Sequence, residues 1–167
     1  MSLASMVIRR FKRNGRNGAF LRVFDHFDER QKHRILASFS PAPGEVPLIA
    51  ELRGDDVRLL LTDLRLISKT GSHEYCFRAV EIEDARLPIK KMIAKGSHKA
   101  DTADIELKRR NGGYHVLTAE NGPPLFGLLN AILCWINTTS RSAESCPDTI
   151  TNDLQGADSG NVVGAAS

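Results

Sequence analysis

Apolar and basic residues alternate with the period of a helix over residues 1–18. When residues are placed about 100° apart, the apolar ones fall on one side and the basic ones on the other. The apolar side holds Leu3, Ala4, Val7 and Phe11, and the basic side holds Arg9, Lys12, Arg13 and Arg16. Arg10 departs from this pattern, and two Asn-Gly pairs follow it. The pattern predicts an amphipathic helix within a basic, flexible arm that covers residues 1–18.

A second helical pattern covers residues 19–40. Phe20, Phe24, Phe27 and Ile35 recur at spacings of three, four and eight residues, which is typical of the apolar face of a helix. The segment 41–44, Pro-Ala-Pro-Gly, ends the pattern, because proline lacks an amide donor and restricts the residue before it. We expect a helix over residues 19–40.

After residue 45 the period changes from 3.6 to 2, and short apolar runs alternate with turn signals. The run 58–69, RLLLTDLRLISK, divides into two strands. Thr62-Asp63 offers a side-chain acceptor for a tight turn, and Asp is unfavourable in a strand centre. About seven strands are expected, over residues 46–52, 57–62, 65–69, 74–78 with 80–83, 89–94, 103–108 and 114–119. We expect 89–94 to pair with 103–108.

An apolar helix is predicted at 125–137, after a Pro-Pro pair that suits a first helical turn. Its apolar face is formed by Leu125, Leu128, Leu129, Ile132 and Ile136. Phe126, Leu133 and Trp135 widen that face, so the helix either closes one end of a sheet or meets another subunit. From residue 139 small and polar residues dominate, which cannot bury enough apolar area to offset chain entropy. We expect a disordered tail over 139–167.

Length and composition limit the class of protein. The chain has 167 residues, of which 41% are hydrophobic, enough for one domain with a packed core. The longest apolar run, 125–136, is shorter than a membrane-spanning helix, and no secretory signal is expected. Three widely spaced cysteines favour reduced thiols and a cytoplasmic location. Association with the periphery of a membrane stays open.

The net charge of +3 is unevenly distributed along the chain. Residues 140–167 contain one basic residue against four acidic ones, so the positive excess lies in residues 1–139. Six basic residues precede the first acidic residue, Asp25. A basic arm and a mildly acidic tail therefore flank the folded part.

Two segments and the order of elements carry a family resemblance. Residues 61–67, LTDLRLI, resemble a strand end written LTDxRLI, and residues 105–117 resemble a penultimate hairpin, both recurrent in bacterial PH-like and GRAM-like modules of the pleckstrin-homology (PH) superfold. The resemblance covers residues 45–138. It implies a mainly β (α+β) fold, in which a curled seven-stranded antiparallel sheet or barrel is capped by the C-terminal helix. The helix at 19–40 is then an addition at the N-terminus.

The resemblance implies a non-catalytic binding module that acts as a protein-interaction or membrane-peripheral adaptor. Lipid-binding proteins similar to this fold usually carry Lys and Arg between their first two strands, whereas 53–56, Arg-Gly-Asp-Asp, is acidic on balance. We expect the arm to contact an anionic surface instead, with Phe11 as its apolar anchor. The basic residues expected there are Arg9, Lys12, Arg13 and Arg16, with a second contact from Lys90, Lys91 and Lys95. Leu133 and Trp135 are candidates for a partner-facing or self-association surface.

Alternatives remain open for both the arm and the whole protein. The arm also fits a disordered leader or an organellar presequence, because it is rich in arginine and free of acids. The whole chain also fits an inhibitor or immunity-type protein that covers a partner protein. A weak, non-specific nucleic-acid binder is a further alternative, although aromatic residues form only 6% of the chain.

Catalytic chemistry is not expected. The sequence lacks a phosphate-binding glycine loop, a nucleophile elbow and a paired-carboxylate motif. His26 and His33 lack the spacing and the further ligands that a metal site needs. Cys76 lies in the middle of an expected strand, where a small apolar role is expected. We predict no metal, no cofactor and no small-molecule substrate.

Overall fold

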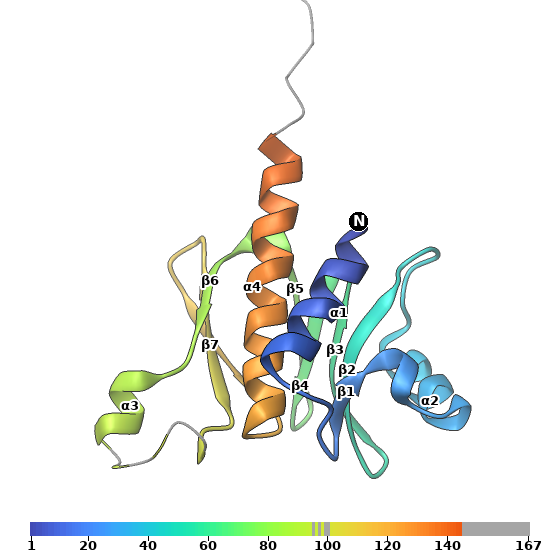
Figure 1. Ribbon diagram of the computed structural model, residues 1–167, viewed down its shortest axis with the longest axis horizontal. Coiled ribbons are helices and arrows are strands. Elements are labelled where there is room, and N and C mark those ends of the chain that lie inside the picture. Colours follow the sequence, from blue (N-terminus) through green and yellow to red (C-terminus); the bar gives the residue numbers. More distant parts are fainter. Residues whose placement is uncertain (95, 97, 99–100, 145–167) are drawn as a thin grey trace, which may run out of the picture.

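The computed structural model describes residues 1–94, 96, 98 and 101–144, with the backbone alone for residues 141–144. Within this part of the chain, two antiparallel sheets and four α-helices form an α+β fold (Figure 1). The first sheet has five strands in the order β1-β2-β3-β4-β5, and the second has three in the order β6-β7-β8. The two sheets do not close into a barrel.

The elements follow one another along the chain with short connections. The first sheet consists of β1 (Leu21–Val23), β2 (Pro47–Arg53), β3 (Asp56–Thr62), β4 (Arg65–Thr70) and β5 (His73–Arg78). The second consists of β6 (Ile82–Arg86), β7 (Asp104–Arg109) and β8 (Tyr114–Thr118). The helices are α1 (Leu3–Asn14), α2 (Glu29–Phe39), α3 (Ile89–Ala94) and α4 (Pro123–Glu144), and short 3-10 helices occupy η1 (Phe24–His26) and η2 (Ala79–Glu81).

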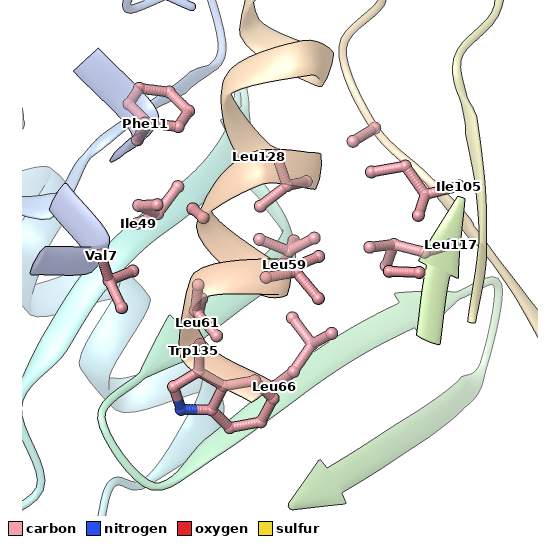
Figure 2. Packing of buried hydrophobic residues seen from close by; sticks show 14 of the residues in the cluster. Val7, Phe11, Ile49, Leu59, Leu61, Leu66, Ile105, Leu117, Leu128 and Trp135 are labelled. Atoms are coloured by element: carbon pink, nitrogen blue, oxygen red, sulfur yellow. The ribbon is translucent and has the colours of Figure 1, made fainter. Parts of the chain in front are cut away.

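α4 supplies the centre of the core (Figure 1). Leu66 of the first sheet and Ile105 and Leu117 of the second sheet belong to the apolar cluster around it (Figure 2). Trp135 is fully buried among them, and its indole N–H donates to the carbonyl oxygen of Asp63 at 3.0 Å. Burying one large apolar side chain stabilises the fold by about 1.5–3 kcal/mol. The wide apolar face of this helix is therefore used within one chain.

α1 packs against α4 and runs in the opposite direction (Figure 1). Val7 and Phe11 are fully buried, as an apolar helix face requires. Two glycines let the helices approach closely: a Cβ on Gly127 would lie 2.9 Å from the carbonyl oxygen of Phe11, and one on Gly15 would lie 2.4 Å from that of Pro123. The prediction that Phe11 anchors the arm to an anionic surface is wrong, because its ring is held in the core.

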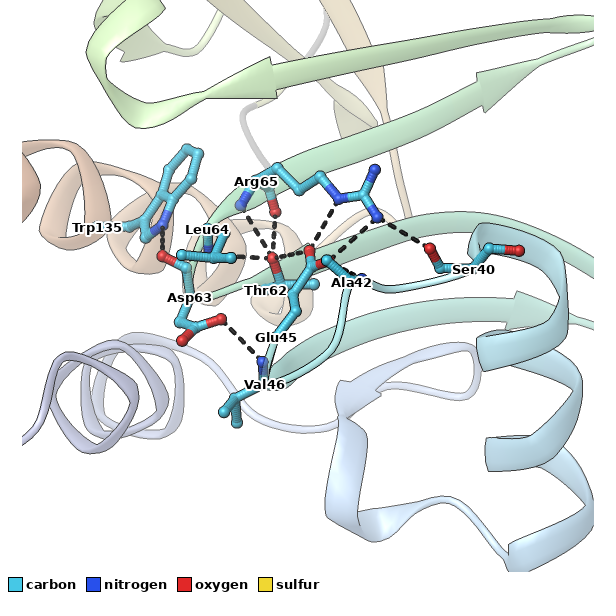
Figure 3. Close-up of polar contacts among 9 residues, drawn as sticks. All are labelled: Ser40, Ala42, Glu45, Val46, Thr62, Asp63, Leu64, Arg65 and Trp135. Carbon is cyan, nitrogen blue, oxygen red and sulfur yellow. Dashed lines mark hydrogen bonds and ion pairs between the residues drawn. The ribbon is translucent and has the colours of Figure 1, made fainter.

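The LTDLR segment forms the turn between β3 and β4 (Figure 3). The Thr62 hydroxyl accepts hydrogen bonds from the backbone N–H groups of Leu64 and Arg65, at 3.1 and 2.9 Å. The Asp63 carboxylate accepts from the backbone N–H of Val46 at 2.8 Å. The two strands predicted within residues 58–69 are thus confirmed, and the turn between them is held by its own side chains.

A buried carboxylate ties this turn to the chain before β2 (Figure 3). Glu45 has a fully buried side chain and accepts from Arg65 Nε at 2.9 Å and Nη2 at 3.1 Å. The Thr62 hydroxyl donates to it at 2.6 Å, and the Ala42 backbone N–H at 2.7 Å. Burial alone raises the pKa of Glu45, but the hydrogen bonds from Arg65, Thr62 and Ala42 outweigh burial, so this pKa lies below its ordinary value.

A second carboxylate holds the chain before β1. Glu120 accepts from the backbone N–H groups of Ala19, Phe20 and Leu21 at 2.7 to 2.8 Å. Burial raises the pKa of Glu120, and these three hydrogen bonds lower it further than burial raises it. The segment after α1 is therefore fixed to the end of β8, close to where α4 begins.

The helix predicted over residues 19–40 is wrong in its first half. Residues 21–23 form β1, and α2 begins at Glu29 because Asp28 accepts the backbone N–H of Gln31 in a capping box. Phe24 and Phe27 are buried, but they reach the outer apolar cluster of the first sheet from η1 and the turn after it. Phe24 and Phe27 have the spacing of an α-helix, but the segment that contains them is a 3-10 helix followed by a turn.

Two further expectations are wrong. Residues 89–94 form α3 rather than a strand, and β7 pairs with β6 and β8. In this helix Met92 is buried, whereas Ile89 and Ile93 are exposed.

The expected start of the tail at residue 139 is also wrong. Residues 139–144 continue α4, and Thr139 Oγ1 donates to the carbonyl oxygen of Trp135 at 2.8 Å. Residues 145–167 lie outside the described residues.

Candidate functional site

A groove of about 690 Å³ runs between α1 and α4 on the side away from the core. Such a volume lies within the range of sites that bind a small molecule or cofactor. α1 contributes three arginines and one methionine, Met1 precedes this helix, and α4 contributes amide, hydroxyl, thiol and aliphatic groups. The groove is lined by Met1, Met6, Arg9, Arg10, Arg13, Asn130, Leu133, Cys134, Asn137 and Thr138.

The groove combines a cationic edge with apolar side chains. Met6 and Leu133, one from each helix, are partly exposed within it. Asn130 donates its side-chain amide to the carbonyl oxygen of Phe126 at 2.8 Å, so this side chain is held in place. A ligand in the groove therefore meets apolar surface and positive charge at the same time.

The arginines of the groove have no acidic partner in the described part of the chain. The guanidinium groups of Arg9, Arg10 and Arg13 make no hydrogen bond or ion pair there. Elsewhere in the described residues, Arg16, Arg22, Arg30, Arg109 and Arg110 also form no ion pair, whereas other arginines do. Arg34, Arg53, Arg58, Arg65, Arg78 and Arg86 each form an ion pair with a carboxylate. The groove is thus a place where the fold brings together guanidinium groups that it does not neutralise.

The sequence predicted part of this set. Arg9 and Arg13 line the groove as two of the expected cationic residues, whereas Lys12 and Arg16 do not. Arg10, which broke the sequence pattern, is in the groove. It was missed because the apolar side of α1 alone does not show where α4 lies.

The two expected interface residues are separated by the fold. Leu133 lines the groove and is partly exposed, whereas Trp135 is fully buried. The proposal of Trp135 as a partner-facing residue is wrong, because its indole fills the core and its N–H is bonded to Asp63. A spacing of two residues along a helix turns side chains to different faces.

Lys90 and Lys91 of the second expected basic set belong to α3 and do not line the groove; α3 lies on the other side of α4 from α1 (Figure 1). Lys91 Nζ contacts Glu106 at 3.1 Å, and Arg86 contacts the same carboxylate group at 3.5 Å. Lys90 is exposed and makes no hydrogen bond or ion pair among the described residues. Lys95 lies outside the described residues.

In the part of the chain that the structure describes, other titratable groups do not gather into a metal site. No group of three or more His, Cys, Asp or Glu side chains among the described residues has a metal-binding arrangement. His115 lies between the rings of Tyr75 and Phe77, with centroid distances of 4.4 and 4.9 Å. Burial, and secondly the charge of Arg109, lowers the pKa of His115 below its ordinary value. His115 is thus partly buried against two aromatic rings.

None of the helices in the described residues is long and apolar enough to cross a membrane.

Comparisons with known proteins do not assign the site. A scan of family models, a search of curated proteins and a search of solved structures each found no match to this chain.

Proposed function

We propose that this protein is a non-catalytic, PH-like binding module that holds an acidic, amphipathic helix of a partner protein in the groove between α1 and α4. One observation carries the proposal: the guanidinium groups of Arg9, Arg10 and Arg13 have no partner in the described residues and border a groove with apolar lining. Arginine is enriched among the residues that dominate protein interfaces.

The chemistry of the lining favours a helix over other anions. A small anion would satisfy the arginines but leave Met6 and Leu133 in water. A single-stranded nucleic acid needs aromatic rings for base stacking, and the lining contains none. An amphipathic helix laid in a groove buries its apolar side and presents carboxylates at its edge. The buried apolar side of α1 also argues against insertion of this helix into a bilayer.

The topology supports the PH-like part of the proposal. A four-stranded meander, β2 to β5, is followed by a three-stranded meander, β6 to β8, and then by a helix that packs between the sheets. β1 is an added edge strand, and α1 and α2 are added helices. The added α1 forms one wall of the groove, and α4, whose lining residues lie within the 45–138 segment that carries the resemblance, forms the other.

A peptide titration tests the proposal. The test peptide is a fluorescein-labelled helix of about five turns with leucines on one side and glutamates beside them, and its twin carries glutamine in place of glutamate. Fluorescence anisotropy measures the dissociation constant of each peptide. We expect the acidic peptide to bind and the neutral twin to bind at least about tenfold more weakly, since hydrogen bonds to charged groups contribute about 1.5–3 kcal/mol each.

A matched pair of variants separates the groove from the general charge of the helix. R9E/R13E and K12E/R16E change the net charge equally, but only the first pair alters the groove lining. We expect R9E/R13E to abolish measurable binding and K12E/R16E to weaken it about threefold at most, through loss of long-range attraction. Equal losses in the two variants, or no binding of the acidic peptide to the unaltered protein, would overturn the proposal.

A further inference from the structure

We infer that α3 forms a second contact surface, separate from the groove, that binds an anionic lipid bilayer and inserts its exposed apolar side chains into the interface. The surface consists of Ile89, Lys90, Lys91 and Ile93. Ile89 is 50% exposed and Ile93 is 75% exposed, and the two lie one helical turn apart on the same side of α3. A short helix that turns two isoleucines to solvent, beside two lysines, has the composition of a membrane-surface contact.

The exposure of the isoleucines is set by the packing of α3. Met92 and Pro88 are buried and attach the helix to the domain. Met92 donates its backbone N–H to the carbonyl oxygen of Pro88 at 3.0 Å, which closes the helical turn. Because Met92 occupies the inward side, Ile89 and Ile93 are left on the outward side and contribute little to the core.

The charges beside the isoleucines match an anionic surface. Lys90 has no partner among the described residues, and the Lys91 side chain remains 65% exposed although it contacts Glu106. α3, Ile89–Ala94, contains two lysines and no acidic residue. Each such lysine near an anionic bilayer strengthens binding about fivefold. A bilayer therefore receives both the aliphatic side chains and the positive charge.

Other occupants fit less well. Two isoleucines on a helix of six residues give too small an apolar area for a stable protein interface. A nucleic acid would use the lysines but gain nothing from the isoleucines. A bilayer needs no complementary pocket, because its interface accepts a protruding apolar tip. α1, which forms one wall of the groove, and α3 lie on opposite sides of α4 (Figure 1), so the two surfaces can be tested independently.

Co-sedimentation with vesicles tests this inference on the full chain. One set of vesicles is phosphatidylcholine alone, and the other contains phosphatidylserine as about a third of its lipid. We expect binding to the anionic vesicles at least tenfold stronger than to the neutral ones. I89S/I93S should weaken the anionic binding by at least tenfold, and K90E/K91E by a similar factor with a smaller salt dependence in what remains.

Two controls keep the outcome decisive. L64S/V80S removes two other exposed apolar side chains, 55% and 43% exposed, and should bind vesicles normally. R9E/R13E should weaken vesicle binding about threefold at most, through loss of long-range attraction, while I89S/I93S should still bind the acidic peptide. Each proposal can therefore fail without affecting the test of the other. The inference is overturned if the protein does not pellet with anionic vesicles or if I89S/I93S pellets like the unaltered protein. The inference is also overturned if the I89S/I93S substitution changes only the oligomer size, measured by light scattering, and not the binding to vesicles.

Discussion

Arg65 and the arginines of the groove differ in whether the fold gives their guanidinium group a carboxylate partner. Arg65 donates to the buried carboxylate of Glu45 through two nitrogens and to the carbonyl oxygen of Ser40 at 3.2 Å. Arg9, Arg10 and Arg13 lie together on α1 without a partner in the described residues. The first arrangement stabilises the β3–β4 turn. The second contributes repulsion between like charges on one helix, so we attribute it to a ligand.

The difference teaches how to separate architecture from binding in this fold. A paired, buried charge is explained by its partner, and its removal should cost stability. An unpaired, converging charge should cost binding when it is removed and leave stability nearly unchanged. The predictions below test that distinction, from the largest expected change to the smallest.

Removal of the paired arginine should give the largest effect. R65A leaves Glu45 buried without its partner, and breaking a buried ion pair lowers the free energy of unfolding by about 3–5 kcal/mol. Urea unfolding followed by circular dichroism measures the change. R58A is the control, because Arg58 forms an exposed pair with Asp56, which is worth about 1 kcal/mol or less. Equal losses in the two variants would show that the Glu45 network is not important for stability.

The second-largest loss of stability is expected when a Cβ is added where α1 crosses α4. G127A places a carbon 2.9 Å from the carbonyl oxygen of Phe11, so the helices must move apart, at about 1–3 kcal/mol. Because α1 carries one wall of the groove, we also expect weaker binding of the acidic peptide. In G113A the nearest contact is an ordinary 3.7 Å, and the free energy of unfolding should change by less than about 0.5 kcal/mol. If G127A matched G113A in both measurements, the close approach would have no consequence.

Acid should destabilise the fold in two steps. The pKa of His115 is lowered by burial, so its stabilising effect is complete above its ordinary value and declines as the pH falls through about 6.5. The pKa values of Glu45 and Glu120 are also lowered, and their contributions decline below about pH 4.5. Urea unfolding at about pH 7 and pH 5.5 isolates the first step. H115Q should reduce the difference between these two pH values, and an unchanged difference would rule His115 out as its source.

Neutralising the groove should have the smallest effect on stability. R9A/R13A removes two charges that have no partner in the described residues, so we expect the free energy of unfolding to stay within about 0.5 kcal/mol of the unaltered protein. The same variant should lose most of its affinity for the acidic peptide. A large loss of stability would instead assign these arginines to the fold.

The sequence predicted those parts of the structure that depend on local pattern. The strands around Thr62-Asp63 and the helix face of Val7 and Phe11 follow from periodicity and turn chemistry, and both are present. The start of α2 had a local signal, the capping box of Asp28 and Gln31, which the helical spacing of Phe24 and Phe27 obscured. The nature of α3 could not be predicted in this way, because tertiary packing of Met92 decided it.

The candidate site was predictable only in part for a related reason. Arg9 and Arg13 share the polar side of a predicted helix, but the groove exists because α4 lies beside α1. The sequence gives no sign that residues more than a hundred positions apart meet, so Arg10 and Asn137 were not expected there. Pairing of charges is likewise a property of the fold, since Arg65 and Glu45 are separated by 20 residues.

Protection of Cys134 tests the central claim most directly, because its side chain lines the groove. With Cys76 and Cys146 replaced by serine, Cys134 is the sole thiol of the chain, and its rate of reaction with a maleimide reports access to the groove. We predict that the acidic peptide slows this reaction in proportion to the bound fraction, and that R9E/R13E removes the effect. Saturating binding of the peptide with no change in the rate at Cys134 would contradict the account.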